Sequence, residues 1–360
     1  MKKLLKAVGG VAGLAGVWAG GSYAAVQVAY KYMFGRSSLL KYSLERKFAD
    51  FDEKYPGRYV RRSVKIPEKD YQLQGYVYDL AEKRRTKGLV IFSHGIFAGH
   101  QSYTTTLLDL VDRGYVVLGY DNTGCCESPG DGVNGLPQGP LDLECVLKYV
   151  DTDPELKDMP RFLFGHSWGG YSVCAVLQFY SKVKGVVSIS GFDTPLEVTS
   201  EMGVSMLGKA VKVTRPMIAL ENRRRFGSNA NLSAIEGINS CTVPVLVMHG
   251  TGDGYVNYNG AGILHHKDEV TNPNATFVPL DYPHRNGHND FLLSASAKEY
   301  TDQIEEWFKP LKKKYKVKNR WDLPEEEQAM VFRDVDMDRC TEINRDLMEK
   351  IDGFFMSCQG

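Results

Sequence analysis

Short, almost continuous apolar runs separated by helical stretches dominate the sequence between residues 88 and 280. A strand that is apolar on both faces is buried on both faces, which is typical of a parallel sheet covered by helices. Two earlier runs, Arg58–Ile66 and Tyr71–Leu80, alternate as an antiparallel pair at a sheet edge does. The pattern predicts an α/β fold with a mostly parallel sheet and helices on both faces. The apolar runs are Gly88–Ser93, Val116–Tyr120, Arg161–Phe164, Val186–Ser190, Val243–Met248 and Thr276–Leu280, and helices between them include Thr104–Asp112 and Leu141–Tyr149.

The segment Gly165-His166-Ser167-Trp168-Gly169 follows one of these strands and precedes a helical stretch. A turn this sharp between strand and helix leaves no room for a Cβ atom two positions on either side of its central residue, which explains both glycines. Ser167 would stand at a helix N-terminus, where backbone N–H groups stabilise negative charge. This context predicts that Ser167 is a nucleophile, with a plain glycine-rich turn as the alternative.

Candidates for the base and the acid that a serine nucleophile needs also follow strands. Asp253 lies in the turn directly after the run Val243–Met248, and His288 follows the last strand and precedes a helical stretch. The chain order serine, acid, histidine is the order expected for this architecture. We therefore predict that Asp253 and His288 are the catalytic partners of Ser167, with His284 as the reserve base. The competing histidines, each more commonly a satisfied polar residue than a base, are His94, His166, His249, His265 and His266.

Two backbone donors must be in place to bind the oxyanion of an acyl-transfer intermediate. The N–H of Trp168, directly after the nucleophile, is the first candidate. The second is expected in the glycine-rich loop from His94 to Gly99, which follows the third strand. We choose Ile96 for this role and Phe97 as the next choice, while a mere tight turn is the alternative interpretation of the loop.

Together these motifs resemble those of α/β-hydrolase fold serine hydrolases, above all the bacterial group related to serine aminopeptidases, monoacylglycerol lipases and cutinase-like esterases. The resemblance covers roughly residues 58–311 and includes His94-Gly95, the nucleophile turn, Asp253, His288 and the loop 120–128. It implies hydrolysis through an acyl-enzyme intermediate without a metal or another cofactor. Relatives usually carry a second glycine where Cys126 stands, so the conformation of that loop is in question, although the catalytic residues are not.

Hydrolysis of a carboxylic ester with an apolar acyl or alkyl group is the leading functional interpretation. A methionine-rich segment of about residues 196–242 interrupts the strand pattern, and we interpret it as a small helical lid that receives the apolar group. An aminopeptidase-like amide hydrolase is the first alternative, because Glu221 or the run Arg223–Arg225 could bind a charged terminus. A non-catalytic ligand-binding scaffold is the second. The expected partner is a small-molecule ester or a short peptide, and the fold alone does not separate the two.

Four parts are expected along the chain. Residues 1–30 form a hydrophobic anchor or signal segment, 31–57 a linker, 58–311 the hydrolase domain with its lid, and 312–360 a C-terminal helical extension. In the extension, Pro324 and the glutamates after it should begin one final helix that packs on the parent domain. The apolar stripe of that helix would be Cys340, Ile343, Leu347, Ile351 and Phe354. A basic stretch from Lys309 to Arg320 is interpreted as a solvated helix end, with contact to anionic lipid as the alternative.

The N-terminal segment begins with a short basic head, Met1 to Lys6, followed by an uncharged stretch from Ala7 to Tyr30 that is long enough to span a bilayer. A signal peptide cut before Ala25 is the alternative. Because the uncharged stretch continues beyond that site, we favour an uncut anchor. We therefore expect a membrane-associated protein with a single N-terminal anchor, whose orientation the flanking basic residues do not decide.

Charge and cysteine content argue against a nucleic-acid-binding protein and against a metal site built from cysteines. The chain has 44 basic and 44 acidic residues, so no net charge favours binding to nucleic acid. Its seven cysteines are odd in number and lack metal-ligand spacing with histidine or with one another. We expect free thiols and no metal site, and these features do not predict the oligomeric state.

Overall fold

The computed structural model describes residues 21, 23–38, 51, 55–82 and 86–359, and the statements below concern this part of the chain. An eight-stranded sheet has the order β1-β2-β4-β3-β5-β6-β7-β8. Strand β1 pairs with β2, and β2 pairs with β4, both in antiparallel fashion, while all further pairs are parallel. The strands are β1 (Tyr59–Glu68), β2 (Tyr71–Leu80), β3 (Leu89–Ser93), β4 (Val116–Tyr120), β5 (Arg161–His166), β6 (Gly185–Ile189), β7 (Val245–Gly250) and β8 (Ala275–Leu280).

The prediction of a mostly parallel sheet behind an antiparallel edge pair is confirmed, and each expected strand lies within a few residues of its observed position. Strand β5 is longer than the predicted apolar run, because it continues through Gly165 and His166. These two residues are not part of the apolar run, but they still pair with Ser188 and Ile189 of β6. Backbone pairing therefore extends the strand to Ser167, beyond the end of the apolar pattern.

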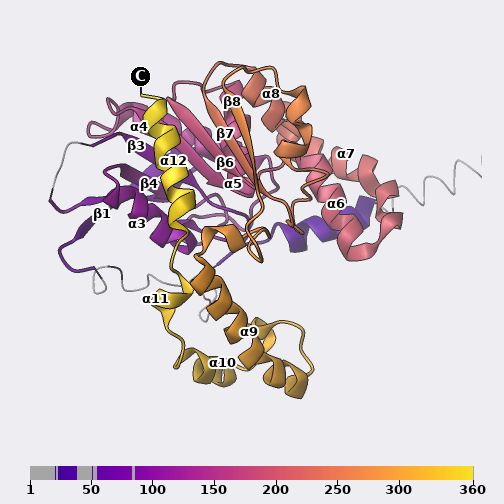
Figure 1. Ribbon diagram of the computed structural model, residues 1–360. Coiled ribbons are helices and arrows are strands. Elements are labelled where there is room, and N and C mark those ends of the chain that lie inside the picture. The colour runs from indigo at the N-terminus through magenta and orange to yellow at the C-terminus, as the bar shows by residue number, and fades with distance from the viewer. Residues whose placement is uncertain (1–20, 22, 39–50, 52–54, 83–85, 360) are drawn as a thin grey trace, which may run out of the picture.

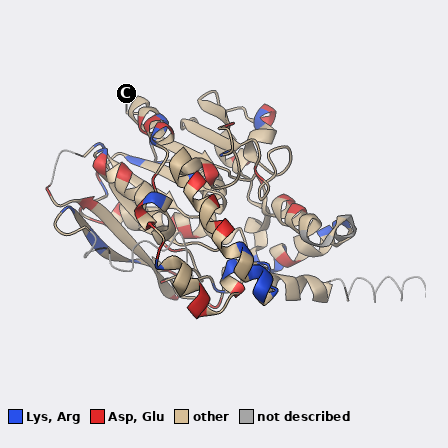
Figure 2. Cartoon of the chain, turned by 60° about the horizontal axis from the view of Figure 1, so that its bottom comes forward, with Lys and Arg blue, Asp and Glu red and all other residues tan. Residues whose placement is uncertain are grey.

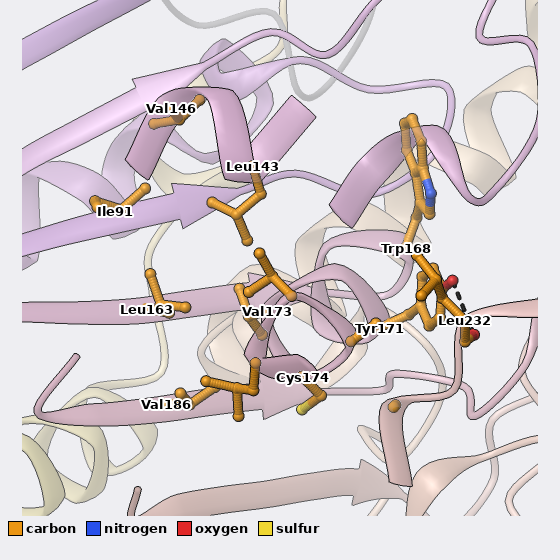
Figure 3. Close-up of a cluster of buried hydrophobic side chains, with 14 of the residues drawn as sticks. Ile91, Leu143, Val146, Leu163, Trp168, Tyr171, Val173, Cys174, Val186 and Leu232 are labelled. Atoms are coloured by element: carbon orange, nitrogen blue, oxygen red, sulfur yellow. Dashed lines mark hydrogen bonds between the residues drawn. The ribbon is translucent and has the colours of Figure 1, made fainter. Parts of the chain in front are cut away.

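Helices cover both faces of the sheet, as Figure 1 shows. Two separate clusters of buried hydrophobic residues form the cores. Alternate residues of a strand point to opposite faces. Ile91 accordingly packs with α4 (Gln138–Thr152), α5 (Trp168–Ala175) and α8 (Ala234–Asn239), whereas Phe92 packs with α3 (Thr104–Asp112) and α12 (Arg345–Ser357). Figure 3 shows the first core, where Leu143 of α4 and Val173 of α5 meet Leu163 of β5. Helix α5, which begins directly after Ser167, is thus buried along its whole length.

Two helices follow the carboxyl end of β6 and correspond to the predicted lid. They are α6 (Pro195–Leu207), which Thr194 caps by accepting a hydrogen bond from the Glu197 amide, and α7 (Arg215–Phe226). The last part of the expected insertion differs, because α8 packs on the body. A Cβ added at Gly237 would lie 2.1 Å from the Cys174 carbonyl oxygen of α5, so only glycine permits this approach. The excursion over the sheet edge therefore ends near residue 231, before α8.

The C-terminal extension does not contain one final helix, and that prediction was wrong. The segment after Pro324 forms α10 (Glu325–Phe332), α11 (Met337–Cys340) and α12. New helices begin because Asp336 and Asn344 act as caps, each accepting hydrogen bonds from amides of the next turn. The expected packing on the parent domain holds for α12, which is part of the second core.

Helices α9 (Ala295–Tyr315), α10 and α11 form a small unit beside the sheet (Figure 1). This unit has an apolar cluster of its own, built on Ile304, Phe308 and Leu323. Short 3-10 helices complete the fold, namely η1 (His100–Tyr103), η2 (Val176–Gln178), η3 (Lys209–Thr214), η4 (Gly227–Asn231), η5 (Ile263–Glu269), η6 (Asp290–Leu292) and η7 (Arg320–Asp322).

The predicted membrane anchor lies mostly outside the described residues, which begin at residue 21. Its last third forms a helix over residues 23–33 that lies against the body, with Val26 and Tyr30 buried in the first core. Beyond it, the Arg36 guanidinium donates hydrogen bonds to the carbonyl oxygens of Cys126, Ser128 and Gly130. Within the described ranges, no helix combines the length and the apolar character that crossing a bilayer requires.

None of the seven cysteines forms a disulfide. Cys125 and Cys174 are buried, and burial raises the pKa of the Cys174 thiol to about 12. The expectation of free thiols is therefore met.

Candidate active site

Ser167 stands at the tip of the turn between β5 and α5 with φ 58° and ψ −117°. A side chain rarely adopts a positive φ, and such strained positions persist only where the surroundings fix them. Here the Ser167 amide donates to the Ile189 carbonyl oxygen at 2.8 Å. A Cβ at Gly165 would lie 2.1 Å from the Gly169 carbonyl oxygen, and a Cβ at Gly169 would lie 1.9 Å from that of Ser93. The two glycines are thus required for the steric reason that the sequence indicates.

The three side chains predicted to act together lie within hydrogen-bonding distance of one another. His288 Nε2 is 2.8 Å from Ser167 Oγ, and His288 Nδ1 is 2.7 Å from Asp253 Oδ2. Asp253 follows β7 and His288 follows β8, so all three residues lie at the carboxyl edge of the sheet. A base in contact with the hydroxyl and a carboxylate in contact with the base is the arrangement that activates a serine.

Asp253 is completely buried and is held by four donors. Oδ1 accepts hydrogen bonds from the amides of Tyr255 and Val256, at 2.9 and 3.0 Å. Oδ2 lies close to the rings of both His288 and His249, the latter at 3.2 Å. Burial by itself raises the pKa of this carboxyl, but the hydrogen bonds from the two imidazoles outweigh it and hold the pKa well below its ordinary value. The group is therefore a carboxylate throughout the neutral range and can orient the His288 ring.

His166 and Tyr103 connect the loop that carries His288, the base loop, to the loop after β3. The Tyr103 hydroxyl is 2.8 Å from His166 Nδ1, and His166 Nε2 is 2.9 Å from the main-chain oxygen of His288. A carbonyl oxygen only accepts, so Nε2 must carry the proton and Nδ1 must accept from Tyr103. The Tyr103 oxygen in turn accepts from the Gly95 amide at 3.3 Å.

These hydrogen bonds link Gly95 through Tyr103 and His166 to His288. The donor and the acceptor of each bond are fixed when the His166 ring is neutral. Burial, and next the neighbouring His288 ring, lower the pKa of His166 to about 3, which meets that requirement. No pattern in the sequence singles out Tyr103, and His166 is predicted there only as a competing base.

Helix α5 and the loop after β3, which carry the predicted oxyanion donors, both adjoin Ser167. Trp168 is the first residue of α5, so its amide has no acceptor within the helix. A Cβ built on Gly95 would lie 3.4 Å from the Cβ of Ser167, which places the loop carrying Ile96 against the nucleophile. Phe97 in the same loop has φ 62°. The assignment of Trp168 and Ile96 as donors stays a prediction.

Loop 120–128 contains the departure from the family pattern at Cys126. This residue has φ 43°, a conformation that a glycine adopts without strain. The loop is fixed around the buried Asp121 carboxylate, which accepts hydrogen bonds from the amides of His100 and Glu127 and from the His100 ring. The Cys126 amide also donates to the Ser37 carbonyl oxygen. These contacts explain how cysteine is held where relatives have glycine.

Other histidines have structural partners. His94 Nδ1 contacts the Gly95 carbonyl oxygen at 2.7 Å, and its Nε2 accepts from the Asn122 amide at 3.0 Å. His249 Nε2 lies 3.0 Å from the Val256 carbonyl oxygen as well as near Asp253. The reserve base, His284, lies in an exposed turn, and the ring that contacts Ser167 belongs to His288. Sequence spacing alone pointed to Asp253 and His288, but it did not reveal that His249 shares the carboxylate.

Glu221, the lid residue considered for binding a charged terminus, is fully buried and already paired. Its Oε1 accepts from Arg224 and Arg225 at 2.7 and 2.6 Å. Its Oε2 accepts from Arg224 at 2.9 Å and from the Tyr23 hydroxyl at 2.8 Å. The hydrogen bonds from Arg224 lower the pKa of Glu221 to about 2 against the opposing effect of burial. All acceptor positions of this carboxylate are therefore occupied by the protein itself.

Comparison with known families finds a match over residues 84–228 to the family described as serine aminopeptidase, S33. The matched region contains the nucleophile turn, the loop after β3 and most of the lid. A proline iminopeptidase of Thermoplasma volcanium is 27% identical over 145 residues, which is 39% of this chain and 48% of that protein. The chain thus spans about half the length of the curated relative that it matches.

Among solved structures, the fold is similar to that of an esterase from Pyrococcus furiosus, Pf2001. The two share 17% sequence identity with a TM-score of 0.54, and the match covers 77% of this chain and 98% of the esterase. A further crystal form of the same esterase gives a TM-score of 0.53. At this identity the likeness establishes the fold, which is that of the α/β-hydrolases.

Proposed function

We propose that this chain, which has the α/β-hydrolase fold, is a serine hydrolase that cleaves carboxylic esters with an apolar acyl or alkyl group. The observation that carries the proposal is the continuous contact from Ser167 Oγ through the His288 ring to the Asp253 carboxylate, at 2.8 and 2.7 Å. The strained backbone of Ser167 supports it, since strain of this kind is concentrated at functional sites.

In the proposed reaction Ser167 Oγ attacks the acyl carbon while its proton moves to His288 Nε2. The tetrahedral intermediate then collapses, the bond to the alcohol oxygen breaks, and His288 returns the proton to that oxygen. A water molecule next attacks the acyl-enzyme, giving its proton to His288. Collapse of the second intermediate releases the carboxylic acid and restores the Ser167 hydroxyl. Asp253 stays ionised throughout and stabilises the imidazolium form of His288.

Negative charge develops on the carbonyl oxygen in both intermediates. We assign its stabilisation to the amides of Trp168 and Ile96, because donors fixed before the reaction do not have to reorganise during it. The start of α5 directs further N–H groups toward the same point.

The state of Glu221 favours an ester over an aminopeptidase substrate. Binding the ammonium group of a peptide requires an available acidic group, and the Glu221 carboxylate is saturated by Arg224, Arg225 and Tyr23. Aminopeptidase-like amide hydrolysis remains the second candidate, because the matched family is described as a serine aminopeptidase and the curated relative as a proline iminopeptidase. A membrane-associated location through the N-terminal segment is also part of the proposal.

Labelling with a fluorophosphonate probe tests the nucleophile, and a panel of ester and aminoacyl-amide reporters tests the substrate class. We expect stoichiometric labelling that is lost in Ser167→Ala, together with a loss of kcat on the order of 10⁶-fold. Ser172→Ala is the matched control. Ser172 is a buried serine of α5, the helix that follows Ser167, and its hydroxyl donates to the Trp168 carbonyl oxygen. Activity within tenfold of wild type in Ser167→Ala or His288→Ala contradicts the assignment, and faster turnover of aminoacyl amides than of esters favours the second candidate.

A further inference from the structure

The helix over residues 23–33 has one buried and one exposed face. Val26 and Tyr30 point into the first core. The opposite face is almost free of charge, although it is in contact with solvent: Val28 is 57% exposed and Tyr32 82% exposed. The exposed residues of this face are Ala24, Ala25, Gln27, Val28, Lys31 and Tyr32. A solvent-facing helix surface is normally polar, so this apolar face requires an explanation.

This helix is fixed to α7 of the lid. The Tyr23 hydroxyl donates to Glu221, the Tyr30 hydroxyl donates to Asn222 at 2.9 Å, and the Arg225 guanidinium lies 5.3 Å from the centre of the Tyr30 ring. On α7, the exposed side chains are those of three arginines, of Pro216 and of Leu220, which is 50% exposed. The two helices thus adjoin at the contacts of Tyr23 and Tyr30.

Positive charge is concentrated in these two segments of a chain whose total net charge is zero. The first 44 residues contain six basic residues and no acidic one. Residues 202–235 contain six basic residues and a single acidic one, Glu221, which is buried between two arginines. Net charge over the whole sequence is zero, so the rest of the chain carries the compensating negative charge. Exposed cations of the lid are Lys212, Arg215, Arg223 and Arg224.

We propose that the exposed faces of the helix over 23–33 and of η3 and α7 together form a docking surface for an anionic lipid bilayer. Cations bind the headgroups, while Val28, Tyr32, Val213 and Leu220 enter the headgroup layer as the apolar face of an interfacial helix does. Each lysine or arginine close to an anionic membrane strengthens binding by roughly fivefold. The lid follows the carboxyl end of β6, so docking turns toward the bilayer the sheet edge on which Ser167 lies. This proposal does not depend on the hydrolysis proposed above.

The basic end of α9, which Figure 2 shows as a dense group of Lys and Arg, is a different kind of surface. The segment 305–327 contains seven basic residues, but also six acidic ones. Several of its cations are neutralised by ion pairs, namely Lys309 with Glu306, Lys312 with Glu305, and Lys314 with Glu327. Anionic lipid should therefore be attracted to the lid and the helix over 23–33 rather than to α9.

Vesicle co-sedimentation of the full-length chain tests the proposal. The vesicles consist of phosphatidylcholine alone or of phosphatidylcholine mixed with phosphatidylglycerol. The lid variant combines Lys212→Gln, Arg215→Gln and Arg223→Gln, and it leaves the arginines that hold Glu221 unchanged. The matched control removes three exposed charges at the end of α9, through Lys313→Gln, Lys316→Gln and Lys318→Gln.

Wild type should bind the mixed vesicles more tightly than the neutral ones, and the lid variant should lose affinity for the mixed vesicles on the order of 100-fold. The α9 control should stay within about threefold of wild type. Equal binding to both vesicle types would mean that the uncharged N-terminal stretch alone holds the chain, and it would overturn the proposal. Wild-type affinity in the lid variant, or equal losses in both variants, would overturn it as well.

A local measurement separates docking of the lid from attachment elsewhere. Trypsin cleavage after Arg223 and after Lys318 is followed by mass spectrometry, with and without the mixed vesicles. We expect the vesicles to slow cleavage after Arg223 and to leave cleavage after Lys318 unchanged. Protection at neither site, or equal protection at both, would contradict docking through the lid.

Discussion

Replacing Tyr103 by phenylalanine removes one hydroxyl and tests whether the chain of hydrogen bonds from Gly95 to His288 sustains catalysis. The hydroxyl donates to His166 Nδ1 at 2.8 Å and accepts from the Gly95 amide at 3.3 Å. In Tyr103→Phe the buried imidazole nitrogen loses its donor, and the preference of His166 for a proton on Nε2 is lost with it. The other tautomer cannot donate to the His288 carbonyl oxygen, so the base loop is no longer held against the nucleophile.

The size of the effect follows from the groups that are left unpaired. A buried acceptor without its partner costs about 1–3 kcal/mol. Because about 1.4 kcal/mol corresponds to a factor of ten, kcat should fall by roughly 5- to 150-fold if this cost is met in the transition state. KM should change little, since neither Tyr103 nor His166 is expected to contact the substrate.

Steady-state kinetics on an ester reporter, together with urea unfolding of each variant, check this expectation. The control is Tyr171→Phe, because Tyr171 is fully buried and its hydroxyl makes a single comparable hydrogen bond, to the Leu232 carbonyl oxygen at 3.0 Å (Figure 3). Both variants should lose stability, but only Tyr103→Phe should lose kcat. The reasoning is refuted if folded Tyr103→Phe keeps kcat within twofold of wild type, or if Tyr171→Phe reduces kcat by as much.

Three further changes have defined outcomes. Gly169→Ala should abolish fluorophosphonate labelling and lower Tm, because its Cβ would lie 1.9 Å from the Ser93 carbonyl oxygen and neither backbone can move without displacing the nucleophile. Asp253→Asn should keep the fold but reduce kcat on the order of 10⁴-fold, a loss visible in single-turnover kinetics, because the amide favours the wrong tautomer of the base. The Glu221 pair with Arg224 should stabilise the lid above the ordinary carboxyl pKa of 4.5 and fail as pH falls toward a pKa of about 2. Hydrogen-exchange protection of the helix over 23–33, measured relative to the intrinsic exchange rate at each pH, should therefore fall on acidification. In Glu221→Gln this protection should already be low at neutral pH.

Features encoded in short stretches of sequence could be predicted. The strands follow from runs of apolar residues, and Ser167, Asp253 and His288 follow from their places directly after strand ends. Each of these signals lies in a short stretch of sequence. The carboxyl ends of parallel strands lie at one edge of the sheet, so residues that follow these strands come together whatever the length of the loops between them. The glycines at 165 and 169 could be explained from the turn alone, before any contact was known.

Contacts between distant parts of the chain could not be predicted in this way. Tyr103 and His166 are 63 residues apart, and no sequence motif around either residue predicts the hydrogen bond between them. The helix breaks at Asp336 and Asn344 were missed because the apolar period continues through them, although both are residues that cap helices well. The N-terminal segment was predicted to be a membrane anchor because it lacks charge. Lack of charge suits a helix packed on a protein surface as well as a helix in a bilayer, and Tyr30 is in fact buried against the protein.

Backbone strain connects these observations at one edge of the sheet. Eight described residues other than glycine have a positive φ, and six of them lie in loops that follow the carboxyl ends of β3, β4, β5, β6 and β8, namely Phe97, Cys126, Asn134, Ser167, Ser190 and His284. Such conformations are unfavourable alone and persist where hydrogen bonds and packing over-determine them. The ring of His166 supplies part of that constraint, because it lies one residue before the strained nucleophile and contacts the base loop directly. We therefore infer that His166 holds three loops in place relative to one another, namely those after β3, β5 and β8.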